Sequence, residues 1–257
     1  MARLISILAG ALLMNVKKLK NKIIRVYQLI QDGQLVHYAK NRVVSYWAPH
    51  SIPIGNNYIG LKAQVYDTHR EKDEYWIAED RSLLHFLNVI GPIRNVLDAP
   101  FGTGRFAPLY YRHNMDIIAL DISQDMIDQA IKKYPAIMEN AKIHVQDMSS
   151  IPYSDKAIDL VVCYRFLPWI VTAAEARTTL GELARVCRKY AILEFCVGKH
   201  QDGSRKIYPD KTLWDRMNER ELRRWLKQFN LNVLEIISLY DDSEHPGLSA
   251  FLCQKLS

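Results

Sequence analysis

The stretch Val96-Leu-Asp-Ala-Pro-Phe-Gly-Thr-Gly-Arg-Phe106 decides the fold, because it joins an apolar run to a glycine-rich turn. The run Asn95 to Asp98 is typical of a buried strand that ends in a carboxylate. Pro100, Gly102 and Gly104 then break the strand and permit a tight turn with close approach of the backbone, and a helix is expected to follow. A strand, a turn and a helix N-terminus in this order gather backbone N–H groups, which predicts a nucleotide-like ligand.

The spacing of acidic residues distinguishes two ligands that such a turn could hold. Gly102-Thr-Gly-Arg-Phe-Ala107 formally matches the dinucleotide pattern G-x-G-x-x-G/A, but Asp98 ends the strand four residues before Gly102. A carboxylate there repels a pyrophosphate and suits a cationic amino group. S-Adenosylmethionine (SAM) carries an amino group, a sulfonium and no phosphate. Asp121 follows Gly102 by 19 residues, about the distance at which a carboxylate takes ribose hydroxyls. We therefore expect SAM rather than NAD.

Five motifs occur in order along the chain. They are Asp98-Ala-Pro-Phe-Gly-Thr-Gly, Leu120-Asp-Ile-Ser, Gln146-Asp-Met, Ile151-Pro-Tyr-Ser-Asp and Ile158-Asp-Leu-Val-Val-Cys. The series resembles the class I SAM-dependent methyltransferases, closest to the small-molecule and quinone C-methyltransferase-like branch, over roughly residues 58–257. Pro100 stands where the family commonly has glycine, and proline is tolerated where the backbone N–H is not needed.

This resemblance implies SAM as the cofactor and assigns residues to its site. The implied cofactor-binding residues are Asp98, Ala99, Pro100, Gly102, Gly104, Asp121, Ile122, Met126, Asp147, Met148 and Tyr164. By the resemblance, Ile122 and Met126 flank the adenine and Asp147 meets its amino group, with the backbone of Met148 beside it. A plain core position is the alternative for Met126.

Apolar runs and helical periodicity alternate along the rest of the chain. We expect strands over residues 95–98, 116–121, 142–146, 159–163, 190–196, 231–240 and 248–254, and helices over 76–90, 105–113, 173–188 and 211–230, with a further helix starting at Ser123. This alternation predicts an α/β fold, a doubly wound, seven-stranded and mostly parallel sheet of Rossmann-like form with an N-terminal helical extension.

Methyl transfer from a sulfonium is an in-line displacement, so the protein mainly positions the acceptor and excludes water. A general base is needed only if the acceptor must lose a proton. The candidates for a catalytic role are Tyr164, Arg165, His200, Tyr66 and His69. Arg165 either binds an anionic substrate or pins a loop, and His200 has the alternative of a surface loop position. Pro168 and Trp169 stand where relatives carry a histidine, which favours an apolar substrate wall.

The segment Tyr58 to Tyr75 resembles the lid that closes over the cofactor in methyltransferases, and a solvated surface helix is the alternative. We place the methyltransferase domain at residues 58–257, a turn-rich linker at 46–57 and a basic, apolar helical segment at 1–45.

The first 31 residues contain six Lys and Arg and no Asp or Glu, and removing them leaves 28 basic against 28 acidic residues. The body therefore gives no electrostatic reason to expect nucleic acid. Residues 4–16 are apolar but reach only about 20 Å as a helix, short of a bilayer core of about 30 Å. A secretory signal is also disfavoured, because the charge follows the apolar run. Residues 1–31 are expected either to anchor the protein peripherally at an anionic membrane surface, to pack on the domain or a second subunit, or to direct organellar targeting.

Four widely spaced cysteines predict buried thiols, no zinc or other metal site, and a reducing, cytoplasmic compartment, with peripheral attachment at the inner face of the membrane as the finer expectation. We expect the acceptor to be a small molecule, a lipid, a quinone-like ring or a lipid-linked glycan. Two alternatives stay open: a non-catalytic SAM-binding subunit that docks a partner, and a nicotinamide-dependent oxidoreductase.

Overall fold

The computed structural model describes residues 58–70, 74–170, 172–197, 218–240 and 248–256. All of them lie in the second of two units into which the chain divides, Pro53–Ser257. The predicted N-terminal segment 1–45, the linker 46–57 and the loop residue His200 lie outside the described residues.

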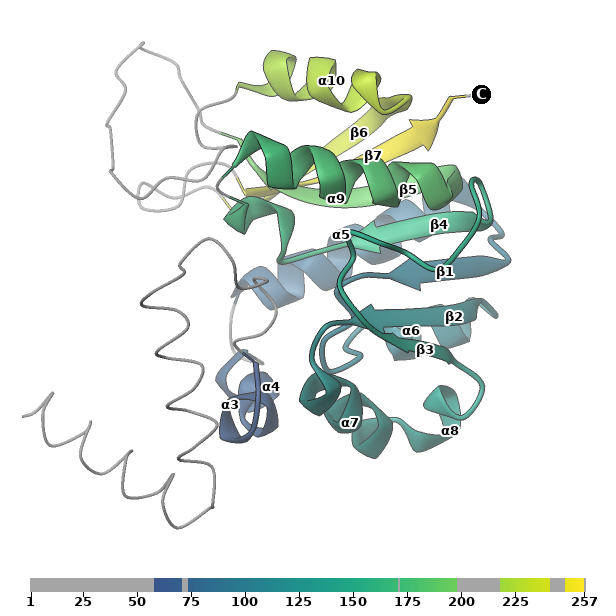
Figure 1. Ribbon diagram of the computed structural model, residues 1–257, viewed down its shortest axis with the longest axis vertical. Coiled ribbons are helices and arrows are strands. Elements are labelled where there is room, and N and C mark those ends of the chain that lie inside the picture. The colour runs from purple at the N-terminus through teal and green to yellow at the C-terminus, as the bar shows by residue number, and fades with distance from the viewer. Residues whose placement is uncertain (1–57, 71–73, 171, 198–217, 241–247, 257) are drawn as a thin grey trace, which may run out of the picture. The chain divides into compact units, whose positions relative to one another are not determined.

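A single seven-stranded sheet organises the described part of the chain (Figure 1). Its strands are β1 (Asn95–Asp98), β2 (Asp116–Asp121), β3 (Lys142–Val145), β4 (Ile158–Cys163), β5 (Cys187–Cys196), β6 (Leu231–Tyr240) and β7 (Leu248–Lys255). Their order is β3-β2-β1-β4-β5-β7-β6. The first five strands are parallel, whereas β7 runs antiparallel to both β5 and β6. The predicted doubly wound, seven-stranded sheet is confirmed.

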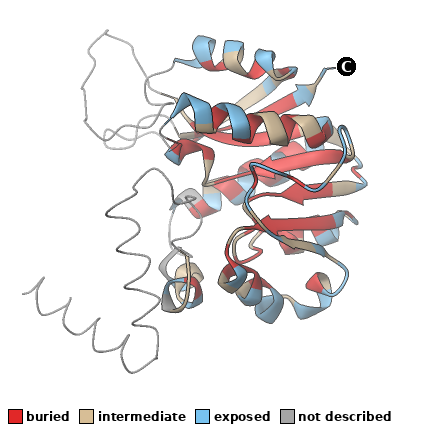
Figure 2. Ribbon diagram, in the orientation of Figure 1, coloured by how far each residue is buried: buried red, intermediate tan, exposed pale blue. Residues whose placement is uncertain are grey.

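Helices cover both faces of the sheet. They are α3 (Leu61–Gln64), α4 (Tyr66–Arg70), α5 (Glu74–Ile90), α6 (Ala107–Arg112), α7 (Gln124–Lys133), α8 (Pro135–Met138), the 3-10 helix η2 (Leu167–Trp169), α9 (Ala173–Val186) and α10 (Glu219–Gln228). One core cluster joins α9 and α10 to the sheet, and a second joins α5 to α8 to the other face. Strands buried on both faces are apolar without alternation, as in Leu160–Cys163 of β4, which is buried along its whole length (Figure 2).

Several predicted boundaries are wrong by two or three residues, and three of them have a visible structural cause. α9 ends at Val186 rather than at residue 188, and β5 begins at once with Cys187, which pairs with Ile158 of β4. α6 begins at Ala107 rather than at Arg105, because Arg105 turns toward α5 and forms an ion pair with Glu79. In both places a tertiary contact sets the boundary and the local pattern does not show it.

The described part of α10 starts at Glu219 with a capping box, in which Asn218 and Glu221 each satisfy a backbone N–H of the other. The first residues of the predicted helix 211–230 lie outside the described residues. None of the described helices is long and apolar enough to cross a membrane.

The carboxyl ends of three neighbouring strands meet at one edge of the sheet. Asp98, the last residue of β1, lies beside Ala119 of β2 and Val162 of β4. Asp121, the last residue of β2, lies beside Val145 at the end of β3. In open α/β sheets this edge is where ligands bind.

Gly104 is needed for close packing as well as for the turn. Its φ is +72°, and a Cβ there would stand 2.9 Å from Cε1 of Phe101 and 3.0 Å from Cβ of Ala130. We expect Gly104→Ala to lower the free energy of unfolding by about 2–5 kcal/mol, from left-handed backbone strain together with overpacking. Gly91 is the matched control, because its φ is also +72° but nothing lies within 4 Å of its Cβ position.

Denaturant unfolding of both variants measures the difference. Gly91→Ala should lose only the backbone contribution of about 1–2 kcal/mol. Equal losses at the two positions would contradict the packing role of Gly104.

Candidate active site

The glycine turn is held by backbone hydrogen bonds at the edge of the sheet. Phe101 N–H donates to the carbonyl of Leu120 (2.8 Å), and Gly104 N–H donates to the carbonyl of Phe101 (3.1 Å). Gly102 and Gly104 adopt φ values of +59° and +72°, in the left-handed region that glycine enters without strain. The two glycines thus fold the chain sharply between β1 and α6.

The carboxylate of Asp121 fastens this turn to the next helix. One of its oxygens accepts the Gly102 N–H and the other accepts the Ser123 N–H, both at 2.8 Å. Ser123 is the N-cap of α7, so Asp121 links the two loops that follow β1 and β2. Burial raises the pKa of Asp121, and the N–H groups of Ser123, Gly102 and Ile122 oppose the rise. An ionised carboxylate has about four acceptor positions, so Asp121 keeps capacity for ligand hydroxyls.

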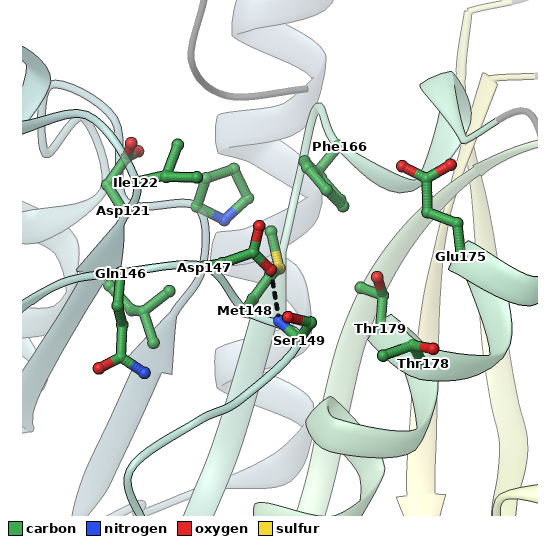
Figure 3. A pocket seen from close by; sticks show the side chains of 12 residues that line it. Asp121, Ile122, Gln146, Asp147, Met148, Ser149, Phe166, Glu175, Thr178 and Thr179 are labelled. Carbon is green, nitrogen blue, oxygen red and sulfur yellow. Dashed lines mark hydrogen bonds between the residues drawn. The ribbon is translucent and has the colours of Figure 1, made fainter. Parts of the chain in front are cut away.

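A cavity of about 250 Å³ opens beside Asp121 (Figure 3). One wall comes from the loops after β1, β2 and β3, with Pro100, Asp121, Ile122, Asp147, Met148 and Ser149. The opposite wall comes from α9, with Glu175, Thr178 and Thr179, and Phe166 of the loop after β4 lies between the walls. The volume is below the roughly 300–1,000 Å³ of sites that enclose a whole drug-sized ligand, which suits a cleft for one end of an extended molecule.

The charges of the side chains that line the cavity indicate which class of ligand it can bind. Among the described residues that line the cavity are three carboxylates, Asp121, Asp147 and Glu175, and no Lys, Arg or His. No group of three or more His, Cys, Asp and Glu side chains in the described part of the chain could hold a metal ion. Such a lining repels a pyrophosphate and accepts hydroxyl and amino donors between apolar side chains. The residues therefore fit an adenosyl group and do not fit a dinucleotide phosphate.

Asp98 lies beneath the turn rather than in the lining. Its side chain is 2% exposed, and burial raises its pKa well above the usual range, while the neighbouring Tyr110 hydroxyl and Arg105 guanidinium oppose the rise. Ala99, beside it, is also fully buried. The predicted contact between Asp98 and a cationic amino group stays a prediction.

The other predicted cofactor residues divide into two groups. Pro100, Ile122, Asp147 and Met148 line the cavity, and their contact with a cofactor stays a prediction. Met126 is buried, and its Cε lies 3.5 Å from the position that a Cβ on Gly102 would take, so it packs against the turn.

Tyr164 faces the other side of the sheet. Its hydroxyl is buried and lies 2.8 Å from the Ser82 hydroxyl of α5, and burial raises its pKa. Tyr164 therefore lies outside the residues that line the cavity.

Arg165 takes part in a buried ion-pair cluster. Its Nε lies 2.7 and 3.0 Å from the two carboxylate oxygens of Glu79, a fully buried residue of α5. Arg105 forms a second ion pair with Glu79 and stacks its guanidinium over Trp76 (4.4 Å) and Phe106 (4.1 Å). This arrangement favours the loop-pinning role among the two alternatives for Arg165, because Glu79 holds the loops after β1 and β4 against α5.

Glu194 completes the cluster from β5. Its carboxylate is buried and accepts the backbone N–H of Arg165. Burial, together with the charge of Glu79, raises the pKa of Glu194 to about 8, and the Arg165 N–H and the charges of Arg165 and Arg105 oppose the rise.

The segment in front of the turn is fastened to it. Asp67 of α4 accepts a hydrogen bond from the Thr103 hydroxyl of the turn (2.6 Å) and forms an ion pair with Lys133 of α7 (2.6 Å). Gly60 N–H donates to Asp125 of α7. Tyr66 is half-buried, and its ring lies 6.2 Å from that of Trp76. The side chain of His69 lies outside the described residues.

Sequence reasoning missed Glu79, Arg105 and Glu194. A signal for two of them was available, because Glu79 shares a helical face with the buried Trp76, Leu83 and Phe86. Glu194 likewise interrupts the apolar run Ala191–Phe195 of a strand that is buried on both faces. A carboxylate at such a position requires a buried partner.

Known proteins are similar to this chain in sequence or in fold. Residues 96–190 match the family described as a methyltransferase domain. An uncharacterised methyltransferase-like protein of Schizosaccharomyces pombe is 30% identical over 116 residues, which cover 42% of this chain and 41% of that protein.

Two solved structures have the same fold. Magnesium protoporphyrin IX methyltransferase from Synechocystis, with bound S-adenosylhomocysteine (SAH), has a TM-score of 0.56 at 16% identity, covering 73% of this chain and 88% of that one. A 1,6-didemethyltoxoflavin-N1-methyltransferase from Burkholderia thailandensis, with bound 1,6-didemethyltoxoflavin and SAH, has a TM-score of 0.57 at 16% identity, covering 80% and 92%.

The matched segment begins at β1 and ends within β5, so it contains the glycine turn, Asp121 and the loops that line most of the cavity. Residues 96–190 therefore belong to a SAM-dependent methyltransferase domain, and the two solved structures share its fold. The chain spans about two fifths of the length of the curated relative it matches.

The raised pKa of Glu194 gives stability a defined pH dependence. Between about pH 5 and pH 8 the folded protein keeps a proton on Glu194 that the unfolded chain releases, so this group lowers the free energy of unfolding as the pH rises. We expect Glu194→Gln to flatten the fall in stability over this range, since the amide oxygen still accepts the Arg165 N–H.

Denaturant unfolding at several pH values between 5 and 8 measures the slope. Glu219→Gln, on the exposed surface of α10, is the control and should keep the wild-type slope. An unchanged slope in Glu194→Gln would show that Glu194 is ionised in the folded protein over this range.

Proposed function

We propose that this protein transfers a methyl group from SAM to a small-molecule acceptor. The observation that carries the proposal is the cavity at the carboxyl edge of the sheet, which Asp121 borders and which holds carboxylates and no cationic side chain among its described lining. The same observation disfavours the nicotinamide-dependent alternative, because a dinucleotide brings a pyrophosphate to this place.

The described residues fit one orientation of the adenosyl group. Asp121 accepts the ribose hydroxyls while it holds the turn, and Ile122, Met148 and Phe166 supply apolar surface for the purine. The methionine end then lies toward the backbone of the glycine turn and the loop after β4. In this orientation the sulfonium faces the segment that contains α3 and α4.

The bound SAM supplies the reactive methyl group, and the protein supplies position and exclusion of water. A displacement in line with the breaking carbon–sulfur bond requires the acceptor atom to be fixed near the methyl group. The contacts of Asp67 with Thr103 and Lys133 hold α4 over the turn, and this supports a lid role for the segment 58–75. A general base is needed only for an acceptor that must lose a proton.

The acceptor enters beside the loop after β4, in this proposal. Trp169 is 62% exposed there and follows the buried Leu167 and Pro168. An exposed indole at the rim of a site offers a flat apolar surface, which suits a ring, a lipid or a lipid-linked acceptor. The quinone C-methyltransferase-like branch remains a prediction.

SAM binding tests this function. We expect Asp121→Asn to raise the Kd for SAM roughly 10- to 150-fold in isothermal titration, because the amide loses the charge-assisted hydrogen bonds of the carboxylate. The control is Asp116→Asn, at the exposed opposite end of the same strand, which should keep the wild-type Kd.

A Kd that is unchanged in Asp121→Asn, with the thermal unfolding midpoint also unchanged, would remove Asp121 from the site. SAM binding without transfer of labelled methyl to any acceptor in a membrane and metabolite extract would favour the non-catalytic alternative.

We propose separately that residues 1–31 attach the protein to a membrane surface. The six basic residues and the apolar stretch of this segment suit a peripheral anchor on an anionic cytoplasmic membrane surface.

Deleting residues 1–31 should release the protein from vesicles that contain anionic lipid, as measured by co-sedimentation. Replacing Lys17, Lys18, Lys20 and Lys22 with Gln should weaken attachment in the same direction, and attachment that persists after the deletion would contradict the anchor.

A further inference from the structure

Tyr110 has no part in the site predicted from the motifs. It lies in α6, the helix that follows the glycine turn, and none of the five sequence motifs includes it. Its side chain is among the largest that are fully buried in the described part of the chain. Phenylalanine would fill nearly the same volume without a polar atom, and a buried tyrosine usually finds a hydrogen-bond partner. The hydroxyl of Tyr110 therefore needs an explanation of its own.

The Tyr110 hydroxyl is buried without a partner. No group in the described part of the chain forms a hydrogen bond with it. Leaving a buried polar group unpaired costs free energy of folding, and such groups are rare in proteins. The hydroxyl is therefore available to a neighbouring group that needs a further hydrogen bond when a ligand binds.

The carboxylate that acts on this hydroxyl is that of Asp98, at the end of β1. Burial and the charge of Asp98 raise the pKa of Tyr110 well above its usual range, so the phenol keeps its proton and can donate it. Burial likewise raises the pKa of Asp98, and among the groups that oppose the rise the Tyr110 hydroxyl has the largest effect. The two side chains are a matched donor and acceptor, one before the glycine turn and one after it.

The ring of Tyr110 is held by aromatic neighbours. Its centroid lies 6.3 Å from that of Phe106, which in turn lies 5.2 Å from the ring centroid of Tyr164. All three side chains are buried, and close-packed rings have little freedom to turn away. A donor fixed in this way is suited to orienting another side chain.

Arg105 is less suited to the same task. It acts on Asp98 through its charge, but its guanidinium donates to the Glu79 carboxylate and to the carbonyl of Trp76. Its hydrogen bonds are thus directed toward α5. Tyr110 has no such competing partner among the described residues.

We propose that Tyr110 is a positioning residue: its hydroxyl donates to the Asp98 carboxylate when Asp98 binds the cationic amino group of SAM or SAH. The inference rests on the proposed function and on the predicted contact of Asp98 with the amino group. A buried ionised carboxylate is costly unless it is both paired and hydrogen-bonded. The amino group supplies the opposite charge from the side of the ligand, and Tyr110 supplies a hydrogen bond from α6.

The test compares SAH with its deamino analogue, in which a hydrogen atom replaces the amino group. Isothermal titration of the full chain gives the Kd for each ligand and the ratio of the two values. Wild type should bind SAH at least about 30-fold more tightly than the analogue, because removing one partner of a buried charge pair leaves the other partner unpaired.

Tyr110→Phe removes the hydroxyl and keeps the ring. It should raise the Kd for SAH about tenfold, the low end of the effect of a hydrogen bond to a charged group. The Kd for the deamino analogue should stay at the wild-type value. Tyr111→Phe is the matched control, because this neighbouring side chain is exposed, and it should leave both Kd values unchanged.

A double-mutant cycle shows whether Tyr110 acts through Asp98. Asp98→Asn removes the charge that binds the amino group, so adding Tyr110→Phe to it should change the Kd for SAH less than about twofold. The thermal unfolding midpoint of Tyr110→Phe should stay at the wild-type value, because among the described residues the hydroxyl has no hydrogen bond to lose. Far-UV circular dichroism shows that each variant is folded.

Three results would overturn the inference. One is an unchanged Kd for SAH in Tyr110→Phe. Another is an equal loss of affinity for SAH and for its deamino analogue, which a packing defect would produce. The third is the same tenfold loss in the Asp98→Asn background. A wild-type protein that binds neither ligand would instead remove the proposed function itself, so the two failures are distinguishable.

Discussion

The buried carboxylate of Asp121 is the constraint on which the site depends. It accepts one backbone N–H from the glycine turn and another from the N-cap of α7, and so it fixes two loops with one side chain. Hydrogen bonds to an ionised acceptor are among the stronger ones in a protein. Because Asp121 ends the strand next to β1, the same group that shapes the turn also borders the cavity in which a ribose would lie.

Much of the fold could be predicted, because parallel strands buried on both faces have a pattern that is hard to mistake. Runs such as Leu160–Cys163 are apolar throughout, and carboxylates end β1 and β2 at the edge where open α/β sheets bind ligands. Boundaries were less accurate wherever a distant partner decides them. Arg105 leaves the predicted helix to reach Glu79, twenty-six residues earlier in the chain.

The buried charges explain why part of the site was missed. Local patterns place Glu79 on an amphipathic helix and Glu194 in a strand, but neither pattern shows that two carboxylates and two arginines come together between α5 and the sheet. The α9 wall was missed for a similar reason: Glu175 and Thr179 are ordinary helix residues until the fold brings them opposite the loops after β2 and β3. Contacts between segments that are far apart in sequence depend on the topology of the fold. The local patterns of a single sequence do not show which of these segments come together.

We propose above all that the cavity bordered by Asp121 holds the adenosyl group of SAM. A crystal structure of the full chain with SAH tests it most directly. We expect both ribose hydroxyls within hydrogen-bond distance of the Asp121 carboxylate and the purine between the loop after β3 and α9. An SAH molecule bound away from this cavity, or one whose ribose does not touch Asp121, would contradict the claim.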